Sequence, residues 1–495
     1  MLPVGTALSI LDGPVSASGY VWYKVAPVSF AELAGPGYGW LAMADKDGQP
    51  WIGPAQGPAA DISLALSKVP RAPADSADAK TAAASINAFG LDLDRRLVTD
   101  KTLALGDRNV VFSPASIALA LAMARAGAKG DTAAQMDKVL HAHGWDSLGP
   151  GVNALDLALA SRNATWEDGD GPKALTLRLA NATFGQRGWA IDPDYLDALA
   201  SAFGTGQRSV DFMADPEAAR KTINAWVNER TAGRIPELLL QPDVTSDTRL
   251  MLVNAIYFKA QWSTWFDEES TKPAPFTRLD GSRVDVPTMS RWGGQELPYA
   301  HGDGWQATEL RYLSPDATHQ LAMTLVLPKD LKTFEAGLTP TQLKTITAAL
   351  SHGPKAMDCP GVPADQQDAG CYAYALSVYL PRFGFETRAE LTAILGALGM
   401  PLAFDPNRAD FGGIHTPGPL FIKTVIHQAN IDVDEKGTEA AAATAVGVDT
   451  GGGPSPAKEI TLRLDHPFLF IVRDVDTGAV LFMGRVVDPS APRGP

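Results

Sequence analysis

The sequence D-E-K-G-T-E-A-A-A-A-T-A, residues 434–445, suits two different places in one fold. Glu435 and its neighbours are typical of an exposed strand end, Gly437 is typical of a hinge, and the residues from Ala440 to Ala445 are small enough to pack elsewhere. Four successive alanines alone favour an ordinary helix. The next residues, V-G-V-D-T-G-G-G-P-S-P-A, contain the glycines and prolines that end a helix. We therefore expect a movable segment followed by an exposed loop.

The alternation of side chains in a strand sharpens this expectation, because successive side chains face opposite sides of a sheet. In an extended segment one face would carry Thr438, Ala440, Ala442, Thr444 and Val446. Glu439 would lie on the other face. The first set is suited to burial and the second to water.

The stretch E-K-G-T-E-A-A-A-A-T resembles the proximal hinge of the reactive-centre loop in serpins, a family of suicide protease inhibitors. The hinge residues by this resemblance are Glu435, Gly437, Thr438, Glu439, Ala440, Ala441, Ala442, Ala443 and Thr444. Other similar stretches follow in the same order as in the family: N-V-V-F-S-P-A-S-I from Asn109, L-V-N-A-I-Y-F-K-A-Q-W ending at Trp262, V-P-T-M from Val286, V-Y-L-P-R-F from Val378, L-G-M from Leu398, and H-P-F with L-F-M-G-R-V-V-D-P near the end. The resemblance covers residues 79–495.

The resemblance implies an α+β fold with three β-sheets, about eight or nine helices and an exposed reactive-centre loop. Residues 1–56 alternate short apolar runs with turn signals and resemble a bacterial SH3-like module, with Trp22, Trp40 and Trp51 at aromatic positions. These tryptophans either form the core of the module or bind a cell-wall or surface ligand. We expect residues 57–78 to be a linker. The pattern of the module begins a strand or two late, so we expect an upstream segment with a signal peptide. We expect an extracellular or cell-surface location, with a cytoplasmic location as the alternative.

Four polar residues in apolar surroundings, Ser113, Ser116, Asn254 and His427, match the shutter region of the family, a hydrogen-bond cluster beneath the main sheet. A buried polar cluster can hold a sheet closed while every member is satisfied. Taken singly, Ser113 is also a helix cap and His427 a structural histidine. Trp262 matches the family's tryptophan at the top of the sheet, the breach.

Composition fits an ordinary soluble protein, and we expect a monomer that is not an enzyme. The formal net charge of −14 disfavours nucleic acid and anionic membranes as partners. No apolar run approaches the roughly 18 residues that span a bilayer. No catalytic, cofactor or metal motif is visible, and the eight histidines are scattered.

The two cysteines, Cys359 and Cys371, lie in one glycine-rich and proline-rich insertion. A disulfide across such a loop would contribute about 3 kcal/mol in the entropic model and would indicate an oxidising compartment. Two unlinked thiols are the alternative.

The resemblance implies a covalent complex with a target serine or cysteine protease. Counting along the family's loop from Glu435 places the scissile bond near Gly451, within a region formed by Val448, Thr450, Gly451 and Gly452. Small residues here favour an elastase-like or subtilisin-like target, whereas Asp449 leaves a protease that cuts after aspartate. A serpin fold with only a binding or structural role is the rival interpretation.

Overall fold

The computed structural model describes residues 62–168, 171–294, 297–316, 320–351, 374–415, 420–438 and 458–491. It also describes the backbone of residues 8–17, 20–27, 39–42, 356–357 and 371–372.

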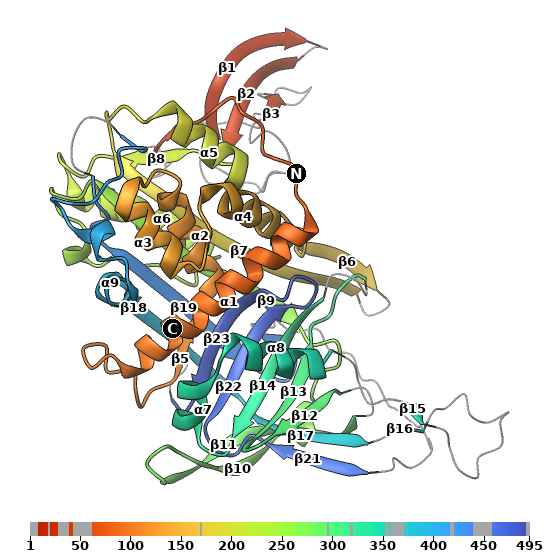
Figure 1. Cartoon of the computed structure of the whole chain (residues 1–495). Helices are drawn as coiled ribbons and strands as arrows, with labels where there is room; N and C mark the ends of the chain where they lie inside the picture. Colours follow the sequence, from red (N-terminus) through yellow and green to blue (C-terminus); the bar gives the residue numbers. More distant parts are fainter. Residues whose placement is uncertain are drawn as a thin grey trace.

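An eight-stranded sheet runs through the centre of the molecule (Figure 1). Its strands lie in the order β18 (Phe383–Glu390), β19 (Val425–Val433), β20 (Gly437–Thr438), β9 (Leu250–Gln261), β7 (Gly171–Gln186), β8 (Gln207–Val210) and β4 (Ser63–Ala65), with β6 (Ala164–Asp168) paired to β7. The first seven residues of β9 are all buried. Such a continuous apolar run is typical of a strand covered on both faces.

Two further sheets pack beside this main sheet. The six-stranded sheet has the order β12 (Tyr299–Gly302), β13 (Trp305–Arg311), β14 (Leu321–Pro328), β22 (Phe468–Asp474), β23 (Val480–Val486) and β5 (Val110–Phe112). The four-stranded sheet has the order β10 (Lys272–Thr277), β11 (Arg283–Gly294), β17 (Ala375–Pro381) and β21 (Glu459–Arg463). The chain from 439 to 458 therefore connects the main sheet at β20 to the four-stranded sheet at β21.

The described residues contain nine α-helices: α1 (Ser76–Thr99), α2 (Pro114–Arg125), α3 (Gly130–Val139), α4 (Trp145–Ala160), α5 (Pro193–Phe203), α6 (Pro216–Arg230), α7 (Leu331–Gly337), α8 (Pro340–Ala349) and α9 (Thr392–Leu398). Helix α2 begins as predicted, because Ser113 accepts the N–H of Ser116 at 3.1 Å and Pro114 is the first helical residue. Every residue of α2 is buried. The expected α+β architecture with three large sheets is confirmed.

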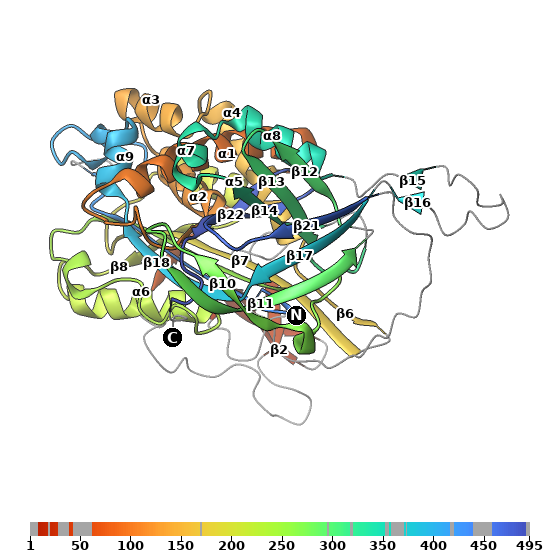
Figure 2. The ribbon, with the colours of Figure 1, turned by 90° about the horizontal axis from the view of Figure 1, so that it is seen from below.

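The two faces of the main sheet are covered by different cores. Figure 2 shows α6 on the side of the sheet opposite to α1, α2 and α4. The larger core joins α1, α2 and α4 to the main and six-stranded sheets. The smaller core lies under α6 and includes Ile223, Trp226 and Val227 of this helix. Helix α6 and the smaller core beneath it therefore form a layer separate from the larger core.

The N-terminal region contains a three-stranded antiparallel sheet of β1 (Leu8–Ala17), β2 (Tyr20–Pro27) and β3 (Gly39–Ala42). Its SH3-like identity stays a prediction. The linker call for residues 57–78 stays a prediction. Within this range β4 pairs with β8, α1 begins at Ser76, and Ile62 is buried in the core under α6.

Candidate functional site at the junction of β9 and β19

β9 and β19 pair with each other along only part of their lengths. A parallel ladder joins four residue pairs, from Leu252 with Val425 to Ala255 with Gln428. β9 continues to Gln261 and β19 to Val433, but the ladder between them does not. Unpaired strand edges are templates for the addition of another strand. This junction therefore has a closed end and an open end.

β20 lies at the open end of the junction, between the two strands. Gly437 and Thr438 pair antiparallel with Gln261 and Ala260 of β9, and Thr438 also pairs with Val433 of β19. The junction thus already holds the first residues of a third strand.

A tight turn brings the chain from β19 into β20. The Asp434 carboxylate accepts the N–H of Lys436 at 2.9 Å and the N–H of Gly437 at 3.1 Å. The Asp434 N–H donates to the carbonyl of Gly437 at 3.0 Å. Burial raises the pKa of Asp434, and the two backbone hydrogen bonds oppose that rise. The turn is therefore fixed by its own side chain.

Glu435 anchors the turn to both sides of the junction. Its side chain is buried and accepts hydrogen bonds from Arg382 Nε at 2.6 Å and from Thr271 Oγ1 at 2.5 Å. Its carbonyl accepts the N–H of Phe266 at 2.9 Å. Arg382 immediately precedes β18, and Phe266 follows β9. The turn is therefore held by chain segments from both flanks of the junction.

Trp262 lies beside the end of β20. Its indole N–H donates to the carbonyl of Asp434 at 3.0 Å, and its backbone N–H donates to the carbonyl of Lys436 at 2.8 Å. Its ring stacks on Tyr312 at a centroid distance of 4.5 Å. The Tyr312 hydroxyl lies 2.7 Å from the hydroxyl of Thr438, and burial raises the pKa of Tyr312. Thr438, the first core-facing residue of the predicted hinge, therefore has a buried hydrogen-bonding partner in Tyr312.

Gly437 is the one residue of β20 that tolerates no side chain. A Cβ atom at this position would lie 2.1 Å from the carbonyl oxygen of Ala260 and 2.8 Å from Cα of Gln261. Both are backbone atoms of β9. The close approach of the two strands therefore requires glycine.

The four polar residues predicted as a cluster do meet, beneath the closed end of the junction. His427 and Asn254 are register partners on β19 and β9, and His427 Nδ1 is hydrogen-bonded to Asn254 Oδ1. Asn254 Nδ2 donates to Ser116 Oγ at 2.6 Å. The backbone N–H of Ser113 donates to His427 Nε2 at 3.1 Å. The N-terminus of α2 and the two strands are thereby linked.

These bonds fix the protonation state of His427. Its Nε2 accepts a hydrogen bond from a backbone N–H, so the proton of the neutral ring lies on Nδ1, which donates to Asn254. Complete burial lowers the pKa of His427 to about 3. The closed junction therefore contains an uncharged histidine at every ordinary pH.

Sequence reasoning missed four members of the site. Asn181, the β7 neighbour of Asn254, accepts from Asn254 Nδ2 at 2.7 Å and from Ser116 Oγ at 2.8 Å. Tyr312, Arg382 and Thr271 hold the hinge. Two of the four could have been found from the sequence. Arg382 lies inside the V-Y-L-P-R-F stretch that resembles the family, and Asn181 is a polar residue in an otherwise apolar stretch. Tyr312 and Thr271 lie far from the hinge in sequence, and nothing local marks them.

Several predicted site residues lie outside the described residues. These are the later hinge residues Glu439 to Thr444, the scissile region Val448, Thr450, Gly451 and Gly452, and Cys359. For Cys371 the structure describes the backbone, which lies in β16 (Cys371–Tyr372) and pairs with Met357 of β15 (Ala356–Met357). The disulfide stays a prediction.

The described structure is an α+β fold of three large sheets, with the short strand β20 seated between two strands of the central one. The family model for serpins, described as serine protease inhibitors, matches residues 84–489. The chain therefore belongs to the serpin family.

Relatives from distant organisms are similar over most of this chain. The leukocyte elastase inhibitor A of Mus musculus is 36% identical over 382 residues, which are 77% of this chain and 93% of the relative. An uncharacterized serpin-like protein of Thermococcus kodakarensis is 36% identical over 409 residues, 82% of this chain and 85% of the relative.

Solved structures have the same fold. The thermophilic serpin tengpin in its native state matches with a TM-score of 0.68 and 24% identity, over 86% of this chain and all of that one. Arabidopsis AtSerpin1 in its native stressed conformation matches with a TM-score of 0.65 and 26% identity, over 84% of this chain and all of that one.

Within the described residues, no helix is long and apolar enough to cross a membrane.

Proposed function

We propose that this chain is a suicide inhibitor that traps a serine or cysteine protease by inserting its cleaved loop between β9 and β19. The observation that carries the proposal is the position of β20, which starts a third strand between β9 and β19, where the described residues of these two strands do not pair with each other. In this proposal Glu435 and Gly437 belong to the hinge, Trp262 to the breach, and the His427 cluster to the shutter.

Extending the register of β20 gives the path of insertion. Continued antiparallel pairing places Ala440 beside Phe258, Ala442 beside Ile256 and Thr444 beside Asn254 of β9. Phe258 and Ile256 belong to the larger core, and Asn254 to the polar cluster. The alternate residue Ala441 falls beside the half-buried Tyr257. The small residues at positions 440 and 442 therefore face the larger core.

On the other side, the same register places Thr444 beside His427. His427 and Asn254 are direct partners in the closed junction. An inserting strand that reaches Thr444 must therefore separate them and break their hydrogen bond. The polar cluster lies where insertion changes from filling an open gap to opening a closed ladder.

The chemistry needs only the protease nucleophile. Its oxygen or sulfur attacks the carbonyl at the scissile bond, the amine on the far side leaves with a proton, and the loop's hinge side remains bound as an acyl-enzyme. Freed at one end, the hinge side inserts and carries the protease with it. Each new ladder bond contributes about 0.5–1.5 kcal/mol, so roughly a dozen provide on the order of 10 kcal/mol. Displacement of catalytic atoms by about 1 Å costs around 100-fold in rate, so deacylation stops.

An elastase-like or subtilisin-like protease is the proposed target. Val448, Thr450 and Gly451 are small and suit a shallow specificity pocket, and no Lys, Arg or aromatic residue occurs between Lys436 and Lys458. Relatives that are 36% identical bear the name leukocyte elastase inhibitor, which supports the same class of target.

Incubation with pancreatic elastase or subtilisin tests the proposal. We expect a band at the summed mass that survives SDS, and the same protease with its nucleophile blocked should give none. Cleavage of the loop without that band would favour the rival, non-inhibitory interpretation.

A further inference from the structure

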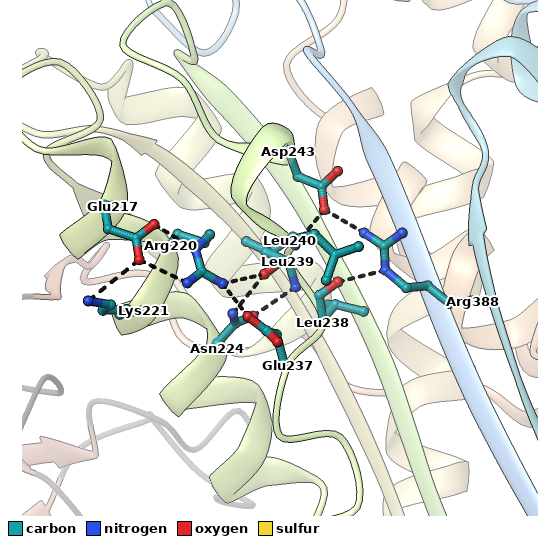
Figure 3. Close-up of polar contacts among 10 residues, drawn as sticks. All are labelled: Glu217, Arg220, Lys221, Asn224, Glu237, Leu238, Leu239, Leu240, Asp243 and Arg388. Carbon is teal, nitrogen blue, oxygen red and sulfur yellow. Dashed lines mark hydrogen bonds and ion pairs between the residues drawn. The ribbon is translucent and has the colours of Figure 1, made fainter. Parts of the chain in front are cut away.

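The segment between α6 and β9 is fastened to α6. Arg220 Nη1 donates to the carbonyl of Leu239 at 2.8 Å and forms an ion pair with Glu237 at 2.5 Å. Asn224 completes the attachment, because its amide donates to the same carbonyl at 2.9 Å and accepts the Leu239 N–H at 2.8 Å (Figure 3). The segment therefore moves with the helix.

The helix and this segment belong to one side of the junction. The core under α6 takes Ala180, Ala182 and Phe184 from β7, Val210 from β8, and Met251, Val253 and Ala255 from β9. From the other side of the junction it takes one residue, Ile426 of β19. The apolar contacts therefore attach the α6 layer mainly to β7, β8 and β9.

Arg388 links this layer to the opposite side. It lies in β18, and its Nε donates to the carbonyl of Leu238 at 3.0 Å. Its Nη2 is paired with the Asp243 carboxylate (Figure 3). Leu238 is fully buried in the core under α6, so its carbonyl has a fixed place. Arg388 therefore joins β18 to a segment that belongs to the β9 side.

We propose that Arg388 is a clamp across the junction that slows strand insertion. This proposal rests on the proposed function and names a regulator of the same site. A strand that enters between β9 and β19 must move them apart by about 4.8 Å, the spacing of neighbouring strands. A hydrogen bond holds only to about 3.2 Å, so the bond from Arg388 to Leu238 must break unless the segment follows β18. Arg220, Asn224 and the buried leucines prevent it from following.

A peptide-incorporation assay measures the clamp directly. The probe is a labelled peptide of residues 438–449, T-E-A-A-A-A-T-A-V-G-V-D, which can add to the unpaired edges of the intact protein. We expect Arg388→Met to incorporate it about tenfold faster than the wild type, the equivalent of about 1.4 kcal/mol of barrier. Asp243→Asn should give a smaller increase, because the bond to the Leu238 carbonyl remains.

Arg278→Met is the matched control for general destabilisation. Arg278 forms an ion pair with Asp488 at 2.6 Å, and both side chains are a little more than a quarter exposed, as Arg388 is. Arg278 lies at the end of the four-stranded sheet, away from the junction. We expect this variant to lose stability without faster incorporation.

The outcomes separate the two proposals. A wild type that forms covalent complex and takes up peptide, with Arg388→Met no faster than wild type, overturns the clamp alone. Equal acceleration in Arg278→Met overturns it as well. A wild type that neither traps a protease nor takes up the peptide overturns the proposed function.

Discussion

His427 joins the two strands of the closed junction to the start of α2. Its neutral ring satisfies the Ser113 N–H and the Asn254 amide oxygen at once. Burial lowers its pKa to about 3, well below the ordinary value of about 6.5. Between these two pKa values the imidazole is protonated in the unfolded state but not in the native state. The free energy of unfolding therefore increases with pH in this window.

We therefore predict that acid weakens the wild type more than His427→Gln, which has no titrating ring. From pH 6.5 to pH 5 the wild type should lose about 1.6 kcal/mol more in the free energy of unfolding. Urea unfolding at both pH values measures the difference. The seven other histidines are common to both proteins and serve as the internal control. Equal losses in the two proteins would show that His427 is protonated in the native state.

At the scale of the element, β20 depends on Gly437. We predict that Gly437→Ala displaces β20 from the junction, because its Cβ would lie 2.1 Å from the Ala260 carbonyl oxygen. The loss in the free energy of unfolding should be about 1–3 kcal/mol, the usual cost of overpacking. Exposure of Trp262, now buried beside β20, should shift tryptophan emission to longer wavelength.

Gly337→Ala is the control for this substitution. A Cβ at Gly337 meets no atom within 4 Å, so we expect a change within about 0.5 kcal/mol and no spectral shift. If Gly437→Ala behaves in the same way, β20 is not seated as the structure places it.

The inserted strand gives a second prediction at this scale, based on which face each residue takes. Ala442→Arg would bury a charge beside Ile256 during insertion, at a cost of several kcal/mol. We expect this variant to be cleaved and released as a substrate. Ala441→Arg changes the same residue type one position earlier, beside the half-buried Tyr257, and should still trap the protease.

The yield of SDS-stable complex, divided by the yield of cleaved inhibitor, measures the effect in both variants. A similar ratio for Ala441→Arg and Ala442→Arg would contradict the predicted register. Loss of complex in Ala441→Arg alone would mean that the register is shifted by one residue.

The sequence predicted the parts of this site that carry a local pattern. Ser113 with Pro114 marks the start of α2, and the small residues from Ala440 onwards mark a segment suited to burial. The partners Tyr312 and Arg388 were not predictable in this way. Each meets the site through the pairing of strands far apart in sequence, and such contacts depend on the whole topology. Strand β4 was likewise not predicted, because its three residues lie in a stretch rich in alanine and proline.

At the scale of the whole molecule, the native fold is a kinetic trap if the proposed function holds. The junction has unpaired ladder positions, and the chain that would fill them is held at both ends, at β20 and at β21. Cutting the loop removes that restraint. The cleaved molecule can then complete the sheet with a central strand.

We therefore predict that cleavage within residues 445–453 stabilises the protein. A gain on the order of 10 kcal/mol, in a domain of roughly 400 residues with an unfolding entropy of about 2.1 cal/mol/K per residue, raises the melting temperature by about 10 °C. Calorimetry before and after limited digestion with subtilisin measures the shift. Ala442→Arg, cleaved in the same way, should gain much less because its strand cannot seat. An unchanged melting temperature in the cleaved wild type would mean that the loop stays outside the sheet, and the trap would have no driving force.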